Sequence, residues 1–274
     1  MRYLSALAFA LFVSGSLAQA HELWIEPVDY QPPAEGRVVA GLVNGQNFGA
    51  GATSIARIAY LPRWFVRFDL GLGGAFVPVE GRIGDLPALS MPVIGEGLHV
   101  AVYQSAGDVV TYDTMEKFVT FAEHKDFPQA LAEHQARGLP ETRFSEYYTR
   151  FSKSLIGVGA GAGADENLGL ETELVALDNP YTSGLSEIRV QLFYQGAPRV
   201  DAQVELFEKS DTAEVVVSLH RTDAQGIAVL PVRPGFAYMA DAVVLRVPDP
   251  ALKTPSPVVW ESLWANLTFA VPVR

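Results

Sequence analysis

The chain has 274 residues, a formal net charge of −11 at pH 7 and no cysteine. The lack of cysteine excludes a disulfide framework, a thiolate metal site and a lipid-modified cysteine anchor. The acidic balance, without any Lys/Arg-rich run, argues against nucleic acid and anionic membrane surfaces as partners. The length suits one large or two modest domains.

The first 20 residues have the pattern of a secretory signal peptide. Arg2 supplies a positive charge, residues 4–13 are apolar, and Ala18-Gln19-Ala20 matches a cleavage site before His21. We therefore expect a periplasmic protein whose signal peptide, residues 1–20, is removed. The apolar run is too short to cross a bilayer, so no membrane span is expected after cleavage. An uncleaved anchor is the alternative interpretation.

Residues 21–113 predict an N-terminal β domain. Segments 38–43, 63–70 and 98–103 are β-branched, aromatic or alternating, and turn signals such as Asn44-Gly45 lie between them. Short strands that recur with turn chemistry between them favour a β-sandwich.

The pattern changes near residue 114, and residues 114–157 predict a small helical insert packed on the N-terminal domain. Residues 115–122 predict a short helix. Residues 128–137 predict another, because they begin with a proline and contain good helix formers.

Large apolar side chains between residues 144 and 155 also recur at helical spacing. On such a helix Glu146 and Arg150 would form an i,i+4 ion pair. The Gly/Ala-rich residues 158–167 then predict an interdomain linker.

Residues 168–274 predict a second β-sandwich, similar to immunoglobulin or transthyretin domains. Apolar residues alternate within 188–192, 200–206 and 227–231, and turn sequences separate these segments. Trp260 and Trp264 lie four apart in the last expected strand, so they share one face. We expect core packing there, and stacking between the two domains is the alternative. The expected fold class is mainly β, with two β-sandwich-like domains and a small helical insert.

Motifs along the whole expected mature chain resemble those of a known family. They are His21-Glu22-x-Trp24-x-Glu26-Pro27, Gly97-Leu98-His99-Val100 with Tyr103-x-Ser105, Glu146-Tyr147-x-x-Arg150-x-x-Lys153-x-Leu155, Leu170-Glu171-x-x-Leu174-Val175-x-Leu177-x-Asn179-Pro180-Tyr181, Thr222-Asp223-x-x-Gly226 and Trp260-Glu261-Ser262-x-x-Ala265-x-Leu267-Thr268-Phe269. In this order they resemble the bacterial periplasmic domain-of-unknown-function family 4198, also labelled a nickel uptake transporter family. The resemblance implies a periplasmic all-β protein tied to transition-metal uptake. It supplies no catalytic residues.

Cleavage after Ala20 would give His21 a free α-amine beside its imidazole, two nitrogen donors on one residue. Both groups lose their proton at little cost near neutral pH, and Ni, Co and Cu all favour such nitrogen ligands. Square amino-terminal Cu/Ni sites need histidine at the third mature position. That position is Leu23 here, so this kind of site is excluded. The competing interpretation is that cleavage leaves His21 at the terminus by chance.

A further ligand must come from the fold, because no two histidines have the HxxxH or HxH spacing of a local metal site. We expect His99, which alternates with apolar neighbours in a strand, or else His134 on the second expected helix. His124 and His220 are the remaining candidates. For each of the four, a structural or surface role is the competing interpretation.

The leading hypothesis is a periplasmic protein that binds a divalent transition metal (Ni, Co or Cu) through His21, with His99 or His134. It would assist metal uptake or handling, with a membrane metal transporter component as a partner. The alternative is a metal-free β-sandwich adaptor of the cell envelope, and a third option is a copper oxidase-like enzyme. The GxSxG, HExxH, Walker and dinucleotide motifs are missing from the sequence, so we do not expect an enzyme.

Overall fold

The structure is a computed structural model that describes residues 21–49 and 55–273. Strands hold 48% of the residues and helices 9%, which confirms the mainly β class expected from the sequence. The expected signal peptide, residues 1–20, lies outside the described residues. Within the described ranges, no helix is both long and apolar enough to cross a membrane.

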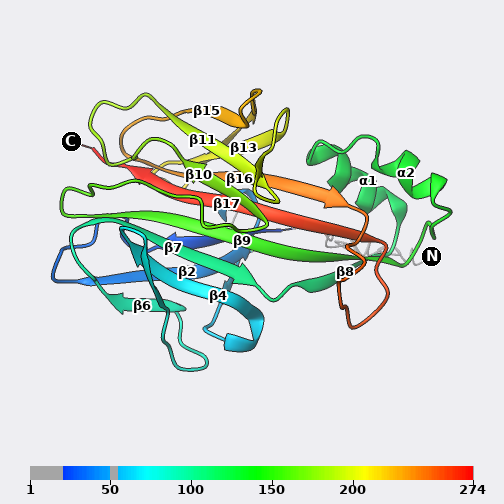
Figure 1. Ribbon diagram of the computed structural model, residues 1–274, viewed down its shortest axis with the longest axis horizontal. Helices are drawn as coiled ribbons and strands as arrows, with labels where there is room; N and C mark the ends of the chain where they lie inside the picture. The colour runs from blue at the N-terminus through cyan, green and yellow to red at the C-terminus, as the bar shows by residue number, and fades with distance from the viewer. Residues whose placement is uncertain (1–20, 50–54, 274) are drawn as a thin grey trace, which may run out of the picture.

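A sheet of nine strands forms the middle layer of the molecule (Figure 1). Its strands are β4 (Phe65–Leu72), β5 (Ala75–Pro78), β7 (Gly97–Ser105), β8 (Asp108–Tyr112), β9 (Phe144–Val158), β13 (Gln203–Lys209), β14 (Val215–Arg221), β16 (Phe236–Arg246) and β17 (Trp260–Val271). They are ordered β14-β13-β16-β17-β9-β7-β4-β5, and β8 also pairs with β9. Strands from both halves of the chain therefore share one sheet.

A smaller sheet of four strands covers one face of the central sheet. Its strands are β1 (Glu22–Pro27), β2 (Arg37–Gly45), β3 (Ala56–Ile58) and β6 (Leu89–Pro92). Ile25 and Leu42 from this sheet pack with Leu70, Ala101 and Ile156 from the central one. The result is a sandwich in the N-terminal half, where β2, β4 and β7 overlap the predicted strands.

A third sheet, also of four strands, covers the opposite face. Its strands are β10 (Thr172–Ala176), β11 (Glu187–Tyr194), β12 (Ala197–Pro198) and β15 (Ile227–Pro231). Val190 and Leu192 pack here with Ala240 and Leu267 of the central sheet, and so does Val100. Successive residues of a strand point to opposite faces. Val100 therefore belongs to the core under this third sheet, whereas Ala101, the next residue of β7, belongs to the core under the small N-terminal sheet.

A parallel pairing of β17 with β9 joins the two sandwiches. It runs from Trp260 opposite Glu146 to Thr268 opposite Ser154. The prediction of a helix over residues 144–155 is therefore wrong. The strand is buried on both faces beyond Arg150, so its apolar residues do not alternate with polar ones and their spacing also fits a helix.

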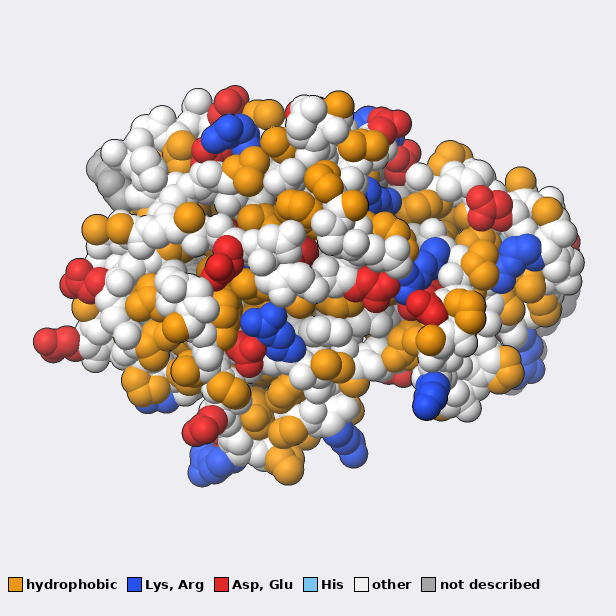
Figure 2. Space-filling view, in the orientation of Figure 1, with side chains coloured by type: hydrophobic (Ala, Val, Ile, Leu, Met, Phe, Trp, Pro, Cys, Tyr) orange, Lys and Arg blue, Asp and Glu red, His pale blue; other side chains and the backbone are white. Residues whose placement is uncertain are grey.

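Two helices, α1 (Met115–His124) and α2 (Ala130–Ala136), form a lobe at one end of the sheets, visible at the same end of the space-filling view (Figures 1 and 2). Phe118 stands 5.3 Å from the Trp260 ring, and Phe121 stacks 5.6 Å from Trp264, as measured between centroids. The two tryptophans thus share one face and one core, as the sequence predicted. The lobe packs on β16 and β17 as well as on β8 and β9, so it does not rest on the N-terminal part alone.

The glycine-rich residues 158–167 form an ordered connection. Asn179 Nδ2 donates a hydrogen bond to Gly161 O at 2.7 Å. Asp165 contributes a carboxylate oxygen 2.7 Å from Nζ of the buried Lys153. The segment is therefore fixed against the sheets, whereas its composition predicted a flexible linker.

Strand β1 is held against the face of the central sheet by side-chain hydrogen bonds. Ser152 Oγ donates to Leu23 O at 2.8 Å, and Asn266 Nδ2 donates to the same oxygen. Thr268 Oγ1 donates to Ile25 O at 2.8 Å. Among the described strands β1 pairs with β2 alone, so these side chains supply the donors that a second neighbouring strand would provide.

Replacing Thr268 with Val should test this docking. The substitution keeps the shape of the side chain and removes the hydroxyl, which leaves the buried Ile25 carbonyl without this donor. We expect the free energy of unfolding to fall by about 1–3 kcal/mol, as measured by urea denaturation. The control is Thr120→Val, which removes an exposed hydroxyl bonded within α1 and should change the value by less than about 0.5 kcal/mol. Equal losses in both variants would contradict a special role for Thr268.

Candidate functional site

His21 immediately precedes β1 and is half-buried. Arg150 Nη2 donates a hydrogen bond to its carbonyl oxygen at 2.6 Å. Glu22 pairs with Gly45, so His21 stands beside Gln46 at the open end of the β1–β2 ladder. The residue with the expected metal donors is thus fixed by its backbone to the central sheet.

His99 lies in β7 and is fully buried, with 0% of its surface exposed. Its Nδ1 stands 3.3 Å from Gly97 O, and its Nε2 has no hydrogen-bond partner among the described residues. Burial lowers the pKa of the ring, so the neutral form is favoured. His99 pairs with Ile156, which follows Arg150 on β9 by six positions, or about 20 Å of strand. The structure therefore does not bring His99 to His21.

His134 is also fully buried, and both of its ring nitrogens are engaged. Trp260 Nε1 donates to Nδ1 at 3.0 Å, and Nε2 stands 2.8 Å from Pro140 O. An indole N–H only donates and a carbonyl only accepts, so the ring is the neutral tautomer with its proton on Nε2. Trp260 precedes Trp264, which pairs with Arg150, by four positions, or about 13 Å of strand. His134 holds the helical lobe on β17 and does not approach His21.

A different histidine, His124, reaches the beginning of β1. It ends α1, and together with Glu22 and Gln46 it lines a small cavity of about 60 Å³. Its Nε2 stands 3.0 Å from Glu205 Oε1, and its side chain is 55% exposed. The hydrogen bond to Glu205 raises the pKa of the imidazole.

Lys125, the next residue, is the centre of a buried ionic cluster. Its Nζ stands 2.7 Å from Glu205, 3.1 Å from Asp241 and 3.3 Å from Glu22. Glu22 Oε2 and Asp241 Oδ1 have no hydrogen-bond partner within the described structure. Burial raises the pKa of Asp241 to about 7. Three carboxylates thus surround one ammonium group, and His124 approaches one of them, Glu205.

The side chains alone do not form a metal centre. Among residues 21–49 and 55–273, no group of three or more His, Asp or Glu side chains is arranged to hold an ion. A centre at the beginning of β1 therefore depends on the main-chain amine that cleavage would create at His21.

Arg150 and Glu146 occupy the same face of β9, next to this cluster. The guanidinium of Arg150 lies 3.9 Å from the centroid of the Trp264 ring. Instead of the ion pair expected on a helix, Glu146 accepts hydrogen bonds from Tyr112 Oη at 2.9 Å and from Ser262 Oγ. Burial raises the pKa of Glu146 to about 7.

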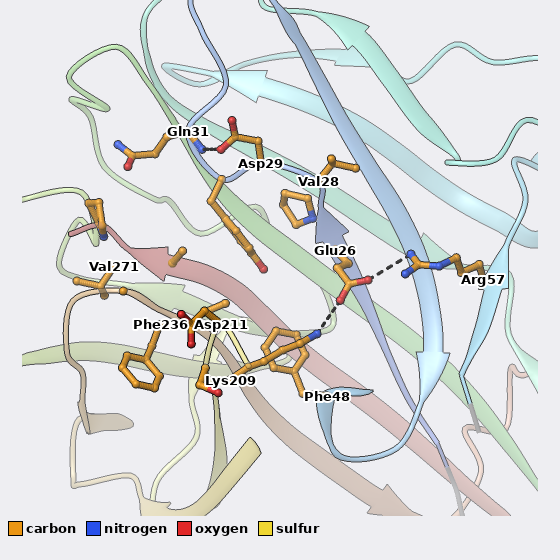
Figure 3. Close-up of a pocket in the computed structure, with 17 residues that line it drawn as sticks. Glu26, Val28, Asp29, Gln31, Phe48, Arg57, Lys209, Asp211, Phe236 and Val271 are labelled. Atoms are coloured by element: carbon orange, nitrogen blue, oxygen red, sulfur yellow. Dashed lines mark hydrogen bonds and ion pairs between the residues drawn. The ribbon is translucent and has the colours of Figure 1, made fainter. Parts of the chain in front are cut away.

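A larger cavity, of about 660 Å³, lies at the other end of β1. Figure 3 shows Glu26 between two cations, with Lys209 Nζ at 3.0 Å and Arg57 Nη1 at 3.3 Å. Lys209 also lies 4.8 Å from the Phe48 ring centroid. None of the histidines lines this cavity, so it is separate from the expected site.

The sequence analysis missed the Lys125 cluster. Its carboxylates come from three strands that are distant in the chain, and only folding brings them together. One local signal was present: Glu205 and Asp241 each stand between apolar residues inside an alternating segment. A charge at such a position, on a strand buried on both faces, requires a partner of opposite sign.

Glu146→Gln should change the dependence of stability on pH. The folded protein raises the pKa of Glu146 from 4.5 to about 7, so between these values it binds more protons than the unfolded chain. The contribution of Glu146 to stability is therefore highest below about pH 4.5 and falls as the pH rises through about 7. The variant should lose about 1–3 kcal/mol less than the wild type between pH 5 and pH 8, as measured by urea denaturation. Exposed Glu187→Gln is the control, and an identical pH dependence in all three proteins would refute a neutral buried Glu146.

Comparison with known proteins gives a family but no function. None of the curated proteins compared matches the chain. A solved structure, described as a tetra-tandem repeat in the extending region of a large adhesion protein, is 12% identical with a TM-score of 0.21. It aligns with 92% of this chain, which spans half (50%) of that chain's length. At this TM-score the likeness supports no conclusion.

The family model described as "Domain of unknown function (DUF4198)" matches residues 18–245. This range covers most of the chain and begins just before the expected cleavage site. The chain therefore belongs to the DUF4198 family.

Proposed function

We propose that the protein is exported to the periplasm, is cleaved after Ala20, and binds one divalent transition-metal ion (Ni, Co or Cu) through the amine and imidazole of His21. The observation that carries the proposal is the position of His21. Its backbone is fixed by Arg150, and the next residue, Glu22, belongs to a cluster in which carboxylates outnumber ammonium groups.

The charge balance of that cluster favours a cation. Glu22, Glu205 and Asp241 surround the ammonium group of Lys125, and the imidazole of His124 approaches Glu205. Two of the carboxylate oxygens have no hydrogen-bond partner in the described part of the chain. Buried carboxylates without compensation are costly. A metal ion bound at the beginning of β1 would offset the negative charge of these carboxylates, and their charge would in turn help to retain the ion.

His124 is the third nitrogen ligand in this proposal, in place of His99 or His134. It lines the same small cavity as Glu22 and Gln46, beside which His21 stands. Its ring is half-exposed and therefore free to turn from Glu205 toward an ion. Because its pKa is raised, protons compete with the metal, and affinity should increase with pH.

The resemblance noted in the sequence, which implies a link to transition-metal uptake, is the second support for a role in metal handling. A single ion held at the end of a strand, on a half-buried residue, can pass to another protein without unfolding of the carrier. In this proposal the receiving partner is a membrane metal transporter component.

Calorimetric titration of the mature protein, with His21 as its first residue, tests the proposal. Ni(II), Co(II), Cu(II) and Zn(II) are added separately, and we expect one tight site per chain. His21→Ala, or an extra methionine before His21 that displaces the amine, should abolish that site. His124→Ala should weaken binding by about tenfold or more, equal to at least about 1.4 kcal/mol.

The matched control for this titration is His220→Ala, which removes a histidine bonded to Ser218 on β14. It should leave the affinity unchanged. Weak binding that is equal in the wild type and all variants would reject a metal site at the N-terminus.

The alternative, a metal-free adaptor of the cell envelope, is favoured by one feature of the surface. Strand β14 is the edge of the central sheet, and it exposes Val216 by 60%, Val217 by 42% and Leu219 by 62%. Exposed apolar edge strands bind other chains by strand addition.

If the protein is such an adaptor, crosslinking in the cell envelope should capture one specific partner, and the crosslink should depend on the exposed residues of β14. Val216→Lys with Leu219→Lys should abolish the crosslink and leave the melting temperature within a few degrees of the wild type. Control substitutions at Val28 and Val247, apolar residues exposed elsewhere by 75% and 56%, should keep it. A crosslink that survives the edge substitutions would reject this role for β14.

A further inference from the structure

A third cavity, of about 400 Å³, also adjoins the beginning of β1, and His124 does not line it. It is formed by the beginning of β1, the end of β2, β3, the short 3₁₀ helix Pro62–Trp64 and the connection between β7 and β8. The residues that matter for its chemistry are Arg63, Trp64, Tyr103, Asp108, Tyr148 and Arg150. No residue of the Lys125 cluster lines it.

The wall of this cavity carries a net positive charge, whereas the protein as a whole is acidic. Two arginines and one aspartate line the cavity, in a chain whose net charge is −11. Arg150 is only 5% exposed, and its Nη1 has no hydrogen-bond partner in the described structure. A buried guanidinium N–H without an acceptor is costly. Asp241, Glu22 and Glu146 already act on the charge of this guanidinium from the protein side. An anionic oxygen that approaches it from the cavity would be stabilised in addition.

Aromatic rings accompany the two arginines. Trp64 is 46% exposed, and the guanidinium of Arg63 lies 5.6 Å from its ring centroid. The guanidinium of Arg150 lies 4.8 Å from the ring of Tyr148. This combination offers a flat surface for a ring and cations for an acidic group, the pattern that binds cyclic carboxylates.

The cavity wall is fixed by hydrogen bonds. Tyr103 Oη donates to Trp64 O at 3.1 Å, and Ala106 N donates to the same oxygen at 2.9 Å. Tyr147 Oη donates to Ala106 O at 2.7 Å. A Cβ on Gly107 would lie 2.1 Å from Tyr147 Oη, so the connection is closely packed there. A preformed wall reduces the ordering cost of binding.

We propose that this cavity binds a small organic anion that carries one carboxylate on a ring. The carboxylate pairs with Arg63 and Arg150, and the ring stacks on Trp64. Asp108, the single acid of the wall, opposes a second negative charge and accepts a hydrogen bond from a hydroxyl or amino group. The ligand is a cyclic monocarboxylate, of which aromatic acids and sugar acids are the two sources.

Titration of the mature protein with four probes tests this assignment. Benzoate and galacturonate represent the two sources, and benzamide and galactose are their uncharged counterparts. Binding is followed by tryptophan fluorescence and calorimetry. We expect saturable one-to-one binding of at least one acid, with its uncharged counterpart at least about tenfold weaker. Binding of benzoate alone, or of galacturonate alone, identifies the source.

Two variants locate the site. Arg63→Gln and Trp64→Ala change residues at the rim and should each weaken binding by about fivefold or more. The matched control is Arg233→Gln, because Arg233 also lies over an aromatic ring, 3.9 Å from the centroid of Phe236, and its loss should have no effect. Failure of both acids to bind at about 10 mM, equal binding of acid and uncharged probes, or wild-type affinity in both rim variants would overturn the proposal.

This outcome is independent of the metal proposal. Arg150 contacts the carbonyl oxygen of His21, not its imidazole. His21→Ala therefore should remove metal binding and leave the affinity for the acid unchanged.

Discussion

The free edge of β1 determines how the N-terminal half of this protein is assembled. Buried carbonyl groups need hydrogen-bond donors, and here the donors are side chains on the face of another sheet. Ser152 and Asn266 bond to Leu23 O, and Thr268 bonds to Ile25 O. These bonds fix where the small sheet lies on the central one. They also place the beginning of β1 next to Lys125 and next to the cavity of about 400 Å³. Both proposed sites therefore depend on these bonds.

On each face of the central sheet, a buried lysine is paired with carboxylates. Lys125 joins the end of α1 to three strands on one face. Lys153 binds Asp165 and Glu173 on the other face, at 2.7 Å and 2.9 Å. Such pairs contribute little net stability once desolvation is counted, but breaking one is costly. Their effect here is to fix how the layers and connections meet. The Lys125 cluster differs from the Lys153 cluster because two of its carboxylate oxygens, on Glu22 and Asp241, have no hydrogen-bond partner among the described residues. That difference is why the Lys125 cluster is the more plausible neighbour of a bound cation.

Local patterns in the sequence predicted the mainly β class, the two sandwiches and the pairing of Trp260 and Trp264 on one face, because alternation and turn chemistry are properties of short segments. They failed for β9, because a strand covered on both faces carries no polar alternation that would distinguish it from a helix. The candidate site shows the same limit. The sequence pointed to His21, but the partners His99 and His134 were chosen from their local context. The structure places each in its own core, and the Lys125 cluster depends on contacts between segments more than 75 residues apart in the chain, such as Lys125 with Glu205, for which no local pattern exists.

The position of β17 has a consequence for how the chain folds as it is made. This strand comes last in the sequence, yet it lies between β16 and β9 in the middle of the sheet. Its side chains enter the core under the third sheet and also the core of the helical lobe. The pairing of Trp260 with Glu146 closes a loop of more than 110 residues, and such distant contacts form slowly. The core under the third sheet and the core of the helical lobe therefore stay incomplete until β17 has been synthesised. A nascent or truncated chain that lacks these last residues is left with two open sheet edges, on β16 and β9, between which β17 would pair.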